Sequence, residues 1–370
     1  ESGKLVSFGL IRMANVKPCI GLSRYLLNSE NDEFDIKVLA YHSRELLLVR
    51  NSKEKYLDTV LKRKESNPLR GVQNPIVNRH IKQSRKSNII FIVVCTPVEE
   101  VGRDHDFDWA IIEPSSMRSI IQLAGRVRRH RTQTTDIKVP NIGVMEFNIK
   151  GAQRKNPAFN HPGFEGSVDS KYVLQTKDMR ILVDWNNQQL VINAIPRISK
   201  PENLSPNLKL ADLEHAVISD KLLNKTDKGA ASVHGWLSEA WFLTALPQLL
   251  NPFRESQNKE IALYKRLLND EFIFCFKDEN NTFHKGEIKY NICSKKLTER
   301  EKSHLWLTLD FSTEVEKLLK TGWKDCETIE DIFSRSPELG EILLLESNPS
   351  QYRNIYIENL GLICGEKMNH

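Results

Sequence analysis

The continuous apolar run NIIFIVVC, at residues 88–95, constrains the fold of this chain more than any other stretch. An unbroken apolar strand is typical of a parallel sheet that is covered on both faces, because a half-exposed strand would alternate polar and apolar residues. Less continuous apolar segments occur at residues 4–12, 34–40, 109–113 and 141–147. Stretches with helical character separate these runs, so the sequence predicts an α/β fold with right-handed crossovers.

The intervening segments are predicted to be helices near residues 17–28, with Asn15 as the cap, and near residues 52–64, 75–86 and 118–129. Residues 150–178 are rich in Gly, Pro and Asn and predict an insertion, whereas residues 179–195 predict a hairpin around Asn186 and Asn187. Further helices are expected at residues 208–223 and 235–250, before short mixed elements begin near residue 260. We therefore expect domain boundaries that give segments 1–205, 206–255 and 256–370.

Charge is distributed unevenly along the chain, whose net charge is +5. Residues 62–86 hold eight Lys or Arg and one acid, whereas residues 324–346 hold seven acids and two bases. A charge run is usually a solvated surface, but a basic stretch next to a sheet of this kind favours a surface that binds nucleic acid. The six cysteines form no Cys-x-x-Cys pair, no apolar run is long enough to cross a membrane, and no export signal is visible. These features predict a cytoplasmic protein with reduced thiols and no metal site.

The loop after residues 88–95 carries the first of two motifs, Thr96-x-x-x-Glu100-x-Gly102-x-Asp104. Ligands of open α/β sheets bind at the carboxyl ends of the strands, which is where this loop is expected. The Thr96 hydroxyl and the backbone N–H groups could hold a nucleic-acid phosphate, and Asp104 could accept a hydrogen bond from a ribose hydroxyl. Cys95 comes directly before this motif, but no partner base follows at a predictable spacing, which favours a buried thiol.

The second motif is Gln122-x-x-Gly125-Arg126-x-x-Arg129, on what is predicted to be a helix. Residues three apart on a helix share a face, so Arg126 and Arg129 are expected to project together. Two guanidinium groups suit a γ-phosphoryl group, whose charge grows in the transition state, and they would act by electrostatic stabilisation. Alone, the Gly-Arg-x-x-Arg pattern is common on solvated helices; its spacing from the Thr96–Asp104 loop favours function.

Together the two motifs resemble motifs V and VI of superfamily 2 helicases. The stretch EEVGRDHDFDWAIIEPSSMRSIIQLAGRVRRHR is similar to the signature of the CRISPR-associated helicase–nuclease of type I interference systems, most nearly subtype I-F. The sequence Tyr-His-Ser-Arg at residues 41–44 resembles the element after the second strand of that family's second RecA-like domain. The resemblance implies strand contacts at Arg12, His42, Ser43, Arg44, Thr96 and Glu100. It implies nucleotide contacts at Gly102, Asp104, Gln122, Gly125, Arg126 and Arg129, the last two as arginine fingers.

The resemblance also implies an architecture and partners. Residues 1–205 would form the second RecA-like helicase domain, residues 206–255 a helical linker, and residues 256–370 a small mixed α+β domain. ATP and Mg²⁺ would be shared with a first RecA-like domain, and the nuclease metal would lie in an HD domain. The partners implied are single-stranded DNA and a Cascade-type CRISPR surveillance complex, for an enzyme that unwinds and degrades target DNA.

The sequence also departs from the family's pattern. Leu123 stands where many superfamily 2 proteins have Arg. No Gly-x-x-x-x-Gly-Lys-Ser/Thr loop and no Asp-Glu-x-His or Asp-Glu-Ala-His occurs, and the separated His and Asp ligands of a nuclease site are missing. His105-Asp106 lies within the first motif, where a metal role is disfavoured. The sequence is therefore interpreted as the carboxy-terminal part of a larger enzyme, which alone is expected neither to hydrolyse ATP nor to cut DNA.

Two alternatives stay open at this point. The chain could be a helicase-like module that binds nucleic acid or a protein partner without motor activity. It could also belong to another superfamily 2 enzyme, such as an RNA helicase or a restriction translocase. A phosphate loop and an HD block upstream in the reading frame would exclude the first alternative, and strand preference in an unwinding assay would test the second.

Overall fold

The structure is a computed structural model that describes residues 3–64, 66–100, 102–131, 139–160, 163–185, 202–223, 233–239, 245–246, 249, 259–346 and 349–367. The chain divides into two compact units. Unit 1 comprises Glu1–Ala110, Arg126–Thr134 and Asn258–His370, and unit 2 comprises Ile111–Gly125 and Thr135–Gln257. The sequence predicted a separate domain from residue 256, whereas the structure groups residues 258–370 with the first strands of the chain.

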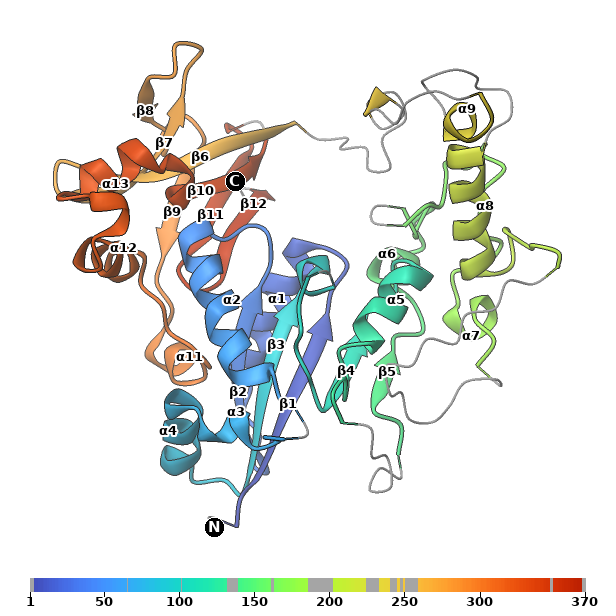
Figure 1. Cartoon of the computed structure of the whole chain (residues 1–370), viewed down its shortest axis with the longest axis horizontal. Helices are drawn as coiled ribbons and strands as arrows, with labels where there is room; N and C mark the ends of the chain where they lie inside the picture. Colours follow the sequence, from blue (N-terminus) through green and yellow to red (C-terminus); the bar gives the residue numbers. More distant parts are fainter. Residues whose placement is uncertain are drawn as a thin grey trace. The chain divides into compact units, whose positions relative to one another are not determined.

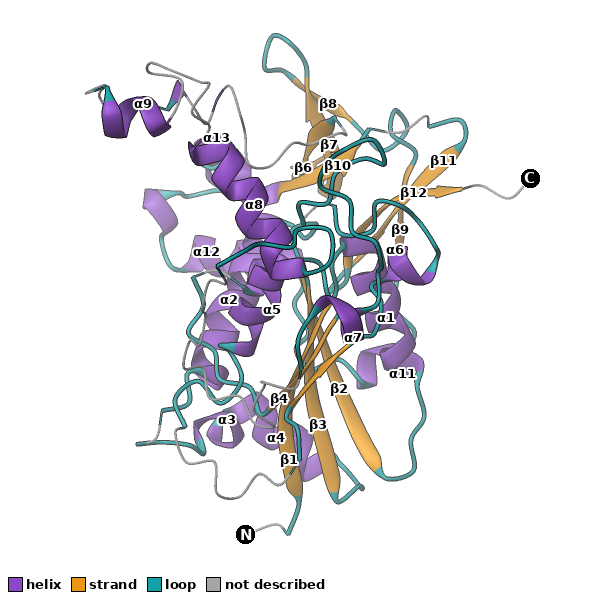
Figure 2. Cartoon of the chain, turned by 90° about the vertical axis from the view of Figure 1, so that its right-hand side faces the viewer, coloured by secondary structure: helices purple, strands orange, loops and turns teal. Residues whose placement is uncertain are grey.

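A five-stranded sheet has the order β2-β3-β1-β4-β5 (Figure 1). Its strands are β1 Leu5–Arg12, β2 Phe34–Tyr41, β3 Asn88–Cys95, β4 Trp109–Ile112 and β5 Ile142–Val144. Strands β1 and β2 both pair with β3 in parallel, and they lie side by side in Figure 2. The predicted α/β class is confirmed, and each of these three strands lies within one residue of its predicted bounds.

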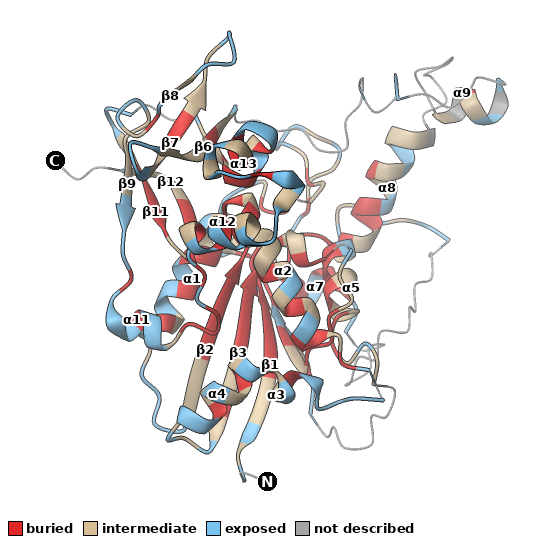
Figure 3. Cartoon of the chain, turned by 60° about the vertical axis from the view of Figure 1, so that its left-hand side comes forward, coloured by how far each residue is buried: buried red, intermediate tan, exposed pale blue. Residues whose placement is uncertain are grey.

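Helices of unit 1 alternate with these strands in the chain. They are α1 Val16–Asn28, α2 Leu47–Leu61, α3 Arg70–Gln73 and α4 Pro75–Gln83. Asn74 caps α4 by accepting from Ile76 N, whereas Asn15, the predicted cap of α1, makes no side-chain cap hydrogen bond. The buried residues of β1, β2 and β3 concentrate toward the carboxyl ends of the strands (Figure 3).

The core of unit 1 joins residues far apart in the sequence. The rings of Phe8 and Phe91 stack at 5.4 Å, and Trp306, which is fully buried, lies 5.2 Å from Phe91. Val38 N donates to His304 O at 2.8 Å, and Val38 O accepts from Trp306 N at 2.9 Å. Buried aromatic pairs contribute about 0.5–1.5 kcal/mol beyond the area that they remove from water. The carboxy-terminal residues therefore complete the core of the sheet.

Two smaller sheets make up the rest of unit 1. One has the order β10-β6-β7-β8 and the other β12-β11-β9. Their strands are β6 Glu260–Leu268, β7 Glu271–Lys277, β8 Phe283–Lys285, β9 Ile292–Lys295, β10 Glu341–Leu345, β11 Tyr352–Ile357 and β12 Gly361–Lys367. The helical segments between them are α11 Glu299–Ser303, α12 Phe311–Lys320, η3 Trp323–Asp325, α13 Ile329–Arg335 and η4 Pro337–Gly340.

Unit 2 contains helices α5 Met117–Ala124, α6 Ile149–Ala152, α7 Met179–Leu182, α8 Leu210–Leu223 and α9 Val233–Ser238. The Glu214 carboxylate on α8 accepts from the backbone N–H groups of Met117 and Arg118, so a negative charge faces the amino end of α5. That placement is favourable because the first N–H groups of a helix have no partner within it. The helix predicted at residues 208–223 is confirmed.

Two predictions about local structure are wrong. Residues 179–182 form α7 rather than the first strand of a hairpin, because the Asp178 side chain accepts from Arg180 N and caps a helical turn. The remainder of the predicted hairpin, from residue 186, lies outside the described residues. The helix predicted over residues 118–129 ends at Ala124, where Gly125 forms its C-cap. Arg126 and Arg129 therefore do not share a helix face.

Candidate nucleotide and nucleic-acid site

Three parallel strands end at the same level and so bring the predicted motifs together. Arg12 of β1 and Tyr41 of β2 are both register partners of Cys95, the last residue of β3. Thr96 N continues this edge by donating to Tyr41 O at 3.2 Å. The Thr96–Asp104 loop and the residues after Tyr41 therefore lie at the carboxyl edge of the sheet, as the position of the motifs predicted.

Arg12 lies within this edge rather than on its surface. Its side chain is fully buried, and its Nε donates to Glu100 Oε1 at 2.8 Å, while Glu100 is itself 8% exposed. A buried guanidinium needs such a partner because an unpaired charge in the interior is costly. The pair joins the end of β1 to the Thr96–Asp104 loop, so in this structure both residues position the loop instead of facing a strand of nucleic acid.

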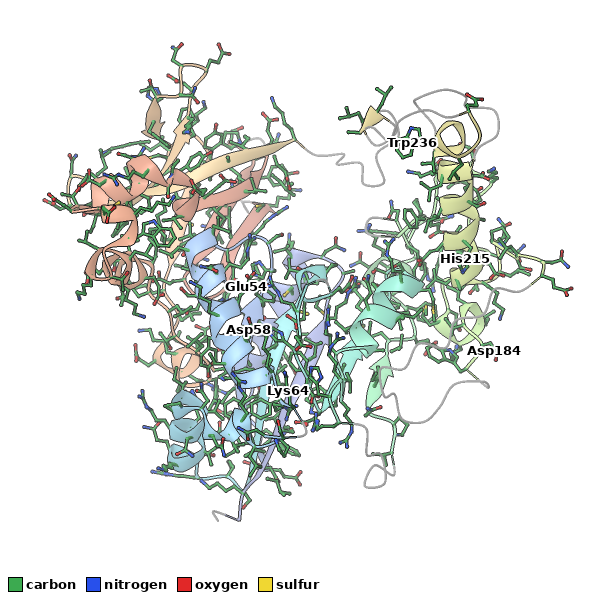
Figure 4. The ribbon with its side chains drawn as sticks, in the orientation of Figure 1. Glu54, Asp58, Lys64, Asp184, His215 and Trp236 are labelled. Atoms are coloured by element: carbon green, nitrogen blue, oxygen red, sulfur yellow. The ribbon has the colours of Figure 1, made fainter. Side chains whose placement is uncertain are left out.

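Helix α2 holds the same loop from the other direction through two acids, Glu54 and Asp58, which Figure 4 labels. Glu54 Oε1 accepts from Arg103 Nη2 at 2.6 Å and from the Tyr41 hydroxyl at 2.6 Å. Asp58 Oδ1 lies 3.2 Å from His105 Nε2, whose other ring nitrogen lies 2.5 Å from Glu99 Oε1. These contacts connect the end of β2, helix α2 and the loop. His105 therefore has a structural role, because it links the loop to α2.

The sequence did not single out Glu54, Asp58 or Glu99. The two acids on α2 are four residues apart, which places them on one helix face, and that spacing was visible in the sequence. Their partners were not, because Arg103 and His105 approach through a loop more than 40 residues away. Among the described residues, no group of three or more His, Cys, Asp or Glu side chains is arranged to hold a metal ion.

Residues 126–129, which we call the arginine segment, follow α5 in a tight irregular conformation. Phe107 N donates to Arg126 O at 2.8 Å and Arg128 N donates to Phe107 O at 2.9 Å, and Arg128 has a positive φ of 48°. This bridge pins the arginine segment to the residues that follow the Thr96–Asp104 loop. The two motifs are thus adjacent, although by a backbone bridge rather than by the predicted helix.

Arg126 is almost completely buried, with 7% of its surface exposed. Its Nη2 donates to Glu100 O at 2.9 Å, and its Nε is buried with no hydrogen-bond partner among the described residues. Burial and the neighbouring Arg129 lower the pKa of this guanidinium. Since a buried donor without a partner costs about 1–3 kcal/mol, the group is suited to an added acceptor.

Arg129 is more accessible, with a side chain that is 38% exposed. Its Nε donates to Asp104 Oδ1 at 2.9 Å, and His130 Nε2 lies 2.8 Å from the same oxygen. Partial burial would raise the pKa of the Asp104 carboxyl, but the hydrogen bonds from Arg129 and His130 outweigh it and lower that pKa. The last residue of the first motif therefore orients the last arginine of the second.

The three remaining predicted nucleotide contacts are Gly102, Gly125 and Gln122. Gly102 has a φ of +70°, a conformation that favours glycine, and a Cβ there would meet nothing within 4 Å. Gly125 closes α5 by donating its N–H to Ile121 O at 3.0 Å. Gln122 lies half-buried on α5. Their roles toward a nucleotide stay predictions.

The residues after β2 differ in accessibility. His42 is fully buried, Ser43 is exposed and Arg44 is half-buried. His42 Nδ1 accepts from Arg44 N at 3.1 Å, so Nε2 carries the proton and donates to Leu360 O at 2.8 Å. Leu362 N donates to Arg44 O at 2.9 Å, and Gly361 has a φ of +84° where a Cβ would lie 2.1 Å from Arg44 O. The turn between β11 and β12 therefore packs on this segment and requires glycine.

Burial and the nearby positive charge of Lys53 lower the pKa of His42 to about 3. In the unfolded chain the ordinary value near 6.5 applies, so below pH 6.5 the unfolded state binds a proton that the folded state excludes. The stability of unit 1 is expected to fall as pH drops from 6.5 toward 3, by up to about 1.4 kcal/mol per pH unit from this group. Urea unfolding at pH 7 and pH 5 measures this slope. His42→Asn, which keeps an acceptor near Nδ1 without titrating, should flatten it, whereas the same change at exposed His284 should not.

Comparison with known proteins extends these observations. Residues 6–132 match the family model described as CRISPR-associated nuclease/helicase Cas3, C-terminal. The chain is 39% identical over 260 residues to the CRISPR-associated nuclease/helicase Cas3 subtype I-F/YPEST of Pseudomonas aeruginosa, covering 69% of this chain and 23% of that protein. It is 36% identical over 288 residues to the protein of the same description from Pectobacterium atrosepticum, covering 75% of this chain and 26% of that protein. The chain thus spans about a quarter of the length of these relatives.

A solved structure, T. fusca Cas3-AMPPNP, aligns with 98% of this chain and 37% of its own at 14% identity and a TM-score of 0.38. In the described part of the chain, no helix is long and apolar enough to cross a membrane. The family match covers β1 through the arginine segment, which is the region that forms the carboxyl edge described above. Most of the chain is thus similar to subtype I-F/YPEST members of the Cas3 family of CRISPR-associated nuclease/helicases, and residues 6–132 match the carboxy-terminal model of that family.

Proposed function

We propose that this chain forms the carboxy-terminal part of an ATP-dependent single-stranded DNA helicase and nuclease that acts in CRISPR type I interference. One observation carries the proposal: the arginine segment and the Thr96–Asp104 loop are held against each other at the carboxyl edge of a parallel sheet. Arg126 donates to Glu100 O, and Arg129 donates to Asp104. Hydrolysis of a nucleotide in a cleft between two domains needs cations on the second wall that face the γ-phosphate. Two arginines beside a loop of phosphate-binding type supply such cations.

Arg126 and Arg129 would face the γ-phosphate of ATP from this wall. The residues present fit such a group, because Arg126 Nε is a buried donor with no partner in the part of the chain that the structure describes, and Arg129 is accessible. Mg²⁺ would neutralise developing charge on the phosphates, and it would be held by a first RecA-like domain, since the described residues include no acidic cluster for it. Gly102, Asp104, Gln122 and Gly125 would shape the cleft and orient the arginines.

The strand of DNA would run along the same edge. Ser43 and Arg44 are the accessible members of the predicted strand-binding set and would contact phosphates directly. Thr96, Arg12, His42 and Glu100 are buried and would position the loop behind that contact. Because Glu100 is bonded to Arg126 on one side and Arg12 on the other, closure of the nucleotide cleft would shift the loop and the strand contacts together.

The partners follow from this proposal. They are single-stranded DNA, the HD nuclease and first RecA-like domains of the same protein, and a surveillance complex of the Cascade type. The test is ATP hydrolysis by the full-length protein with single-stranded DNA, with RNA of the same sequence, and with no nucleic acid. The proposal predicts stimulation by DNA that RNA does not reproduce. No hydrolysis in any of the three would favour a helicase-like binding module, and preference for RNA would favour another superfamily 2 enzyme.

A further inference from the structure

Glu54 of helix α2 lies outside both sequence motifs but is a centre of polar contacts at the carboxyl edge. Its Oε1 lies 2.6 Å from Arg103 Nη2 and accepts from the Tyr41 hydroxyl at 2.6 Å. Arg103 Nη2 also donates to the Tyr41 hydroxyl at 2.7 Å, so the three side chains form a closed triangle. We call Tyr41, Glu54 and Arg103 the α2 hub.

The charges and protons of the α2 hub are well defined. Burial and the hydrogen bond to Glu54 raise the pKa of Tyr41, so its hydroxyl keeps its proton at neutral pH and donates it to the carboxylate. Burial alone would lower the pKa of Arg103, but Tyr41 and Glu54 outweigh it and raise that pKa. The hub is therefore held by charge-assisted hydrogen bonds, which are roughly twice as strong as neutral ones.

On one side the α2 hub reaches the residues predicted to contact a strand of DNA. Tyr41 is the last residue of β2, and Ser43 follows it by two positions. Arg50 Nη1 donates to Ser43 O at 3.3 Å, while Arg50 Nε lies 4.0 Å from Glu54 Oε1. Two routes therefore connect this segment to Glu54: the backbone after Tyr41 and the side chain of Arg50.

On the other side the α2 hub reaches the arginine segment. Arg103 is followed directly by Asp104, whose Oδ1 accepts from Arg129 Nε at 2.9 Å. Burial lowers the pKa of Arg126, and the positive charges of Arg129 and Arg103 add to this effect, which places Arg103 electrostatically near both arginines. A displacement of Arg103 would move the carboxylate that orients Arg129. This connection is separate from the one that Glu100 makes to Arg126.

The α2 hub is able to rearrange. Its charged side chains are partly exposed, at 23% for Glu54 and 25% for Arg103, so water can replace their contacts as they move. Arg103 Nε is buried with no hydrogen-bond partner among the described residues. Because a buried donor without an acceptor is unfavourable, an arrangement that supplies an acceptor competes with the arrangement seen here.

We propose that Glu54 is a positioning residue of the motor, which transmits strand binding after β2 to the arginine segment through Arg103. This inference rests on the proposed function and adds to it the route by which DNA stimulates hydrolysis. DNA bound after β2 shifts the end of that strand, the α2 hub carries the shift to Asp104, and Arg129 is thereby aligned with the nucleotide. Glu54 itself touches neither the DNA nor the nucleotide.

The test is the stimulation ratio of the full-length protein, which is the rate of ATP hydrolysis with saturating single-stranded DNA divided by the rate without DNA. Glu54→Gln keeps the size of the side chain and removes its charge, and it should lower this ratio about tenfold. Arg103→Met should lower the ratio by a similar factor. The double variant should lose little more than either single variant, because both changes break the same link. The affinity of Glu54→Gln for labelled single-stranded DNA, measured by fluorescence anisotropy, should stay near that of the natural protein.

Asp58→Asn is the matched control. Asp58 lies four residues after Glu54 on α2 (Figure 4) and contacts the same loop through His105, 3.2 Å away. In the described part of the chain, no hydrogen bond or ion pair joins Asp58 to the end of β2. This variant should therefore keep the stimulation ratio of the natural protein. A merely structural role of Glu54 would lower the rates with and without DNA alike, which would leave the ratio of Glu54→Gln unchanged.

Three results would overturn this inference: a natural stimulation ratio in Glu54→Gln, an equal loss of the ratio in Asp58→Asn, or losses that add in the double variant. A natural protein that DNA does not stimulate would remove the motor proposal and this inference together. A stimulated natural protein with an equally stimulated Glu54→Gln would remove this inference alone, so the two failures are distinguishable.

Discussion

Replacing Arg129 by alanine in the full-length protein is expected to lower DNA-stimulated ATP hydrolysis by about 10³-fold or more, the effect of removing a transition-state arginine. Arg129 is the accessible member of the pair, and Asp104 and His130 hold its orientation through one carboxylate oxygen. Arg126→Ala should also abolish hydrolysis, because Arg126 supplies the buried donor and braces Glu100 O. Binding of single-stranded DNA should stay largely intact in both variants, as measured by fluorescence anisotropy.

Controls for this experiment lie close in the sequence. Arg118→Ala removes an exposed arginine of α5 that has no assigned role, and it should keep near-normal turnover. Arg129→Lys keeps the charge but not the planar fork, and it should recover only part of the rate. If both alanine variants hydrolyse ATP at close to the natural rate, the role of the arginine segment in the proposed function is removed.

Lys53→Met should destabilise unit 1 by about 3–5 kcal/mol, the usual effect of breaking one half of a buried ion pair. Lys53 is 1% exposed and is bonded to Glu45, to Ala40 O at 2.9 Å and to Asn359 O at 2.9 Å. Burial raises the pKa of Glu45 even with Lys53 present, and its Oε2 has no hydrogen-bond partner among the described residues. Without Lys53 the carboxylate would be buried with no counter-charge, and the contact between α2 and the β11–β12 turn would be lost.

Hydrogen exchange of amides in α2 and β11, followed by mass spectrometry, measures this effect locally and should show exchange faster by about a hundredfold or more. Lys55→Met, an exposed position on the same helix, serves as the control and should change stability by less than about 0.5 kcal/mol. Adding Glu45→Leu to Lys53→Met should restore much of the protection, because an apolar pair of similar volume replaces the ion pair. Exchange in Lys53→Met equal to that in Lys55→Met would contradict the assigned role.

The strands of the large sheet were predictable because each is a long apolar run between polar segments. The predicted bounds of β1, β2 and β3 lie within one residue of those observed. Since parallel strands end at one edge, the sequence also predicted that Thr96 and His42 would lie near each other. The end of α5 at Ala124 was not predicted, although Gly125, its C-cap, is a local stop signal in the sequence. What local pattern could not show is the bridge between Val127 and Phe107, which holds residues 126–129 outside the helix.

The rest of the site depends on contacts between distant segments. Trp306 completes the core beside Phe91, and no periodicity in residues 304–308 indicates that this segment joins β2. The burial of Arg12 and His42 likewise depends on Glu100 and on the turn at Leu360, which are far away in the sequence. A strand-end arginine or histidine looks the same in sequence whether it faces solvent or closes an interior pair. Those assignments could come only from tertiary structure.

The central claim is that Arg126 and Arg129 complete a nucleotide cleft with a domain that precedes this region. The measurement that tests it most directly is a solved structure of the full-length protein with single-stranded DNA and a non-hydrolysable ATP analogue. The account predicts at least one of the two guanidinium groups within hydrogen-bond distance of the γ-phosphate, with Asp104 still beside Arg129. Both groups turned away from the nucleotide, with Arg126 enclosed by protein acceptors alone, would contradict it.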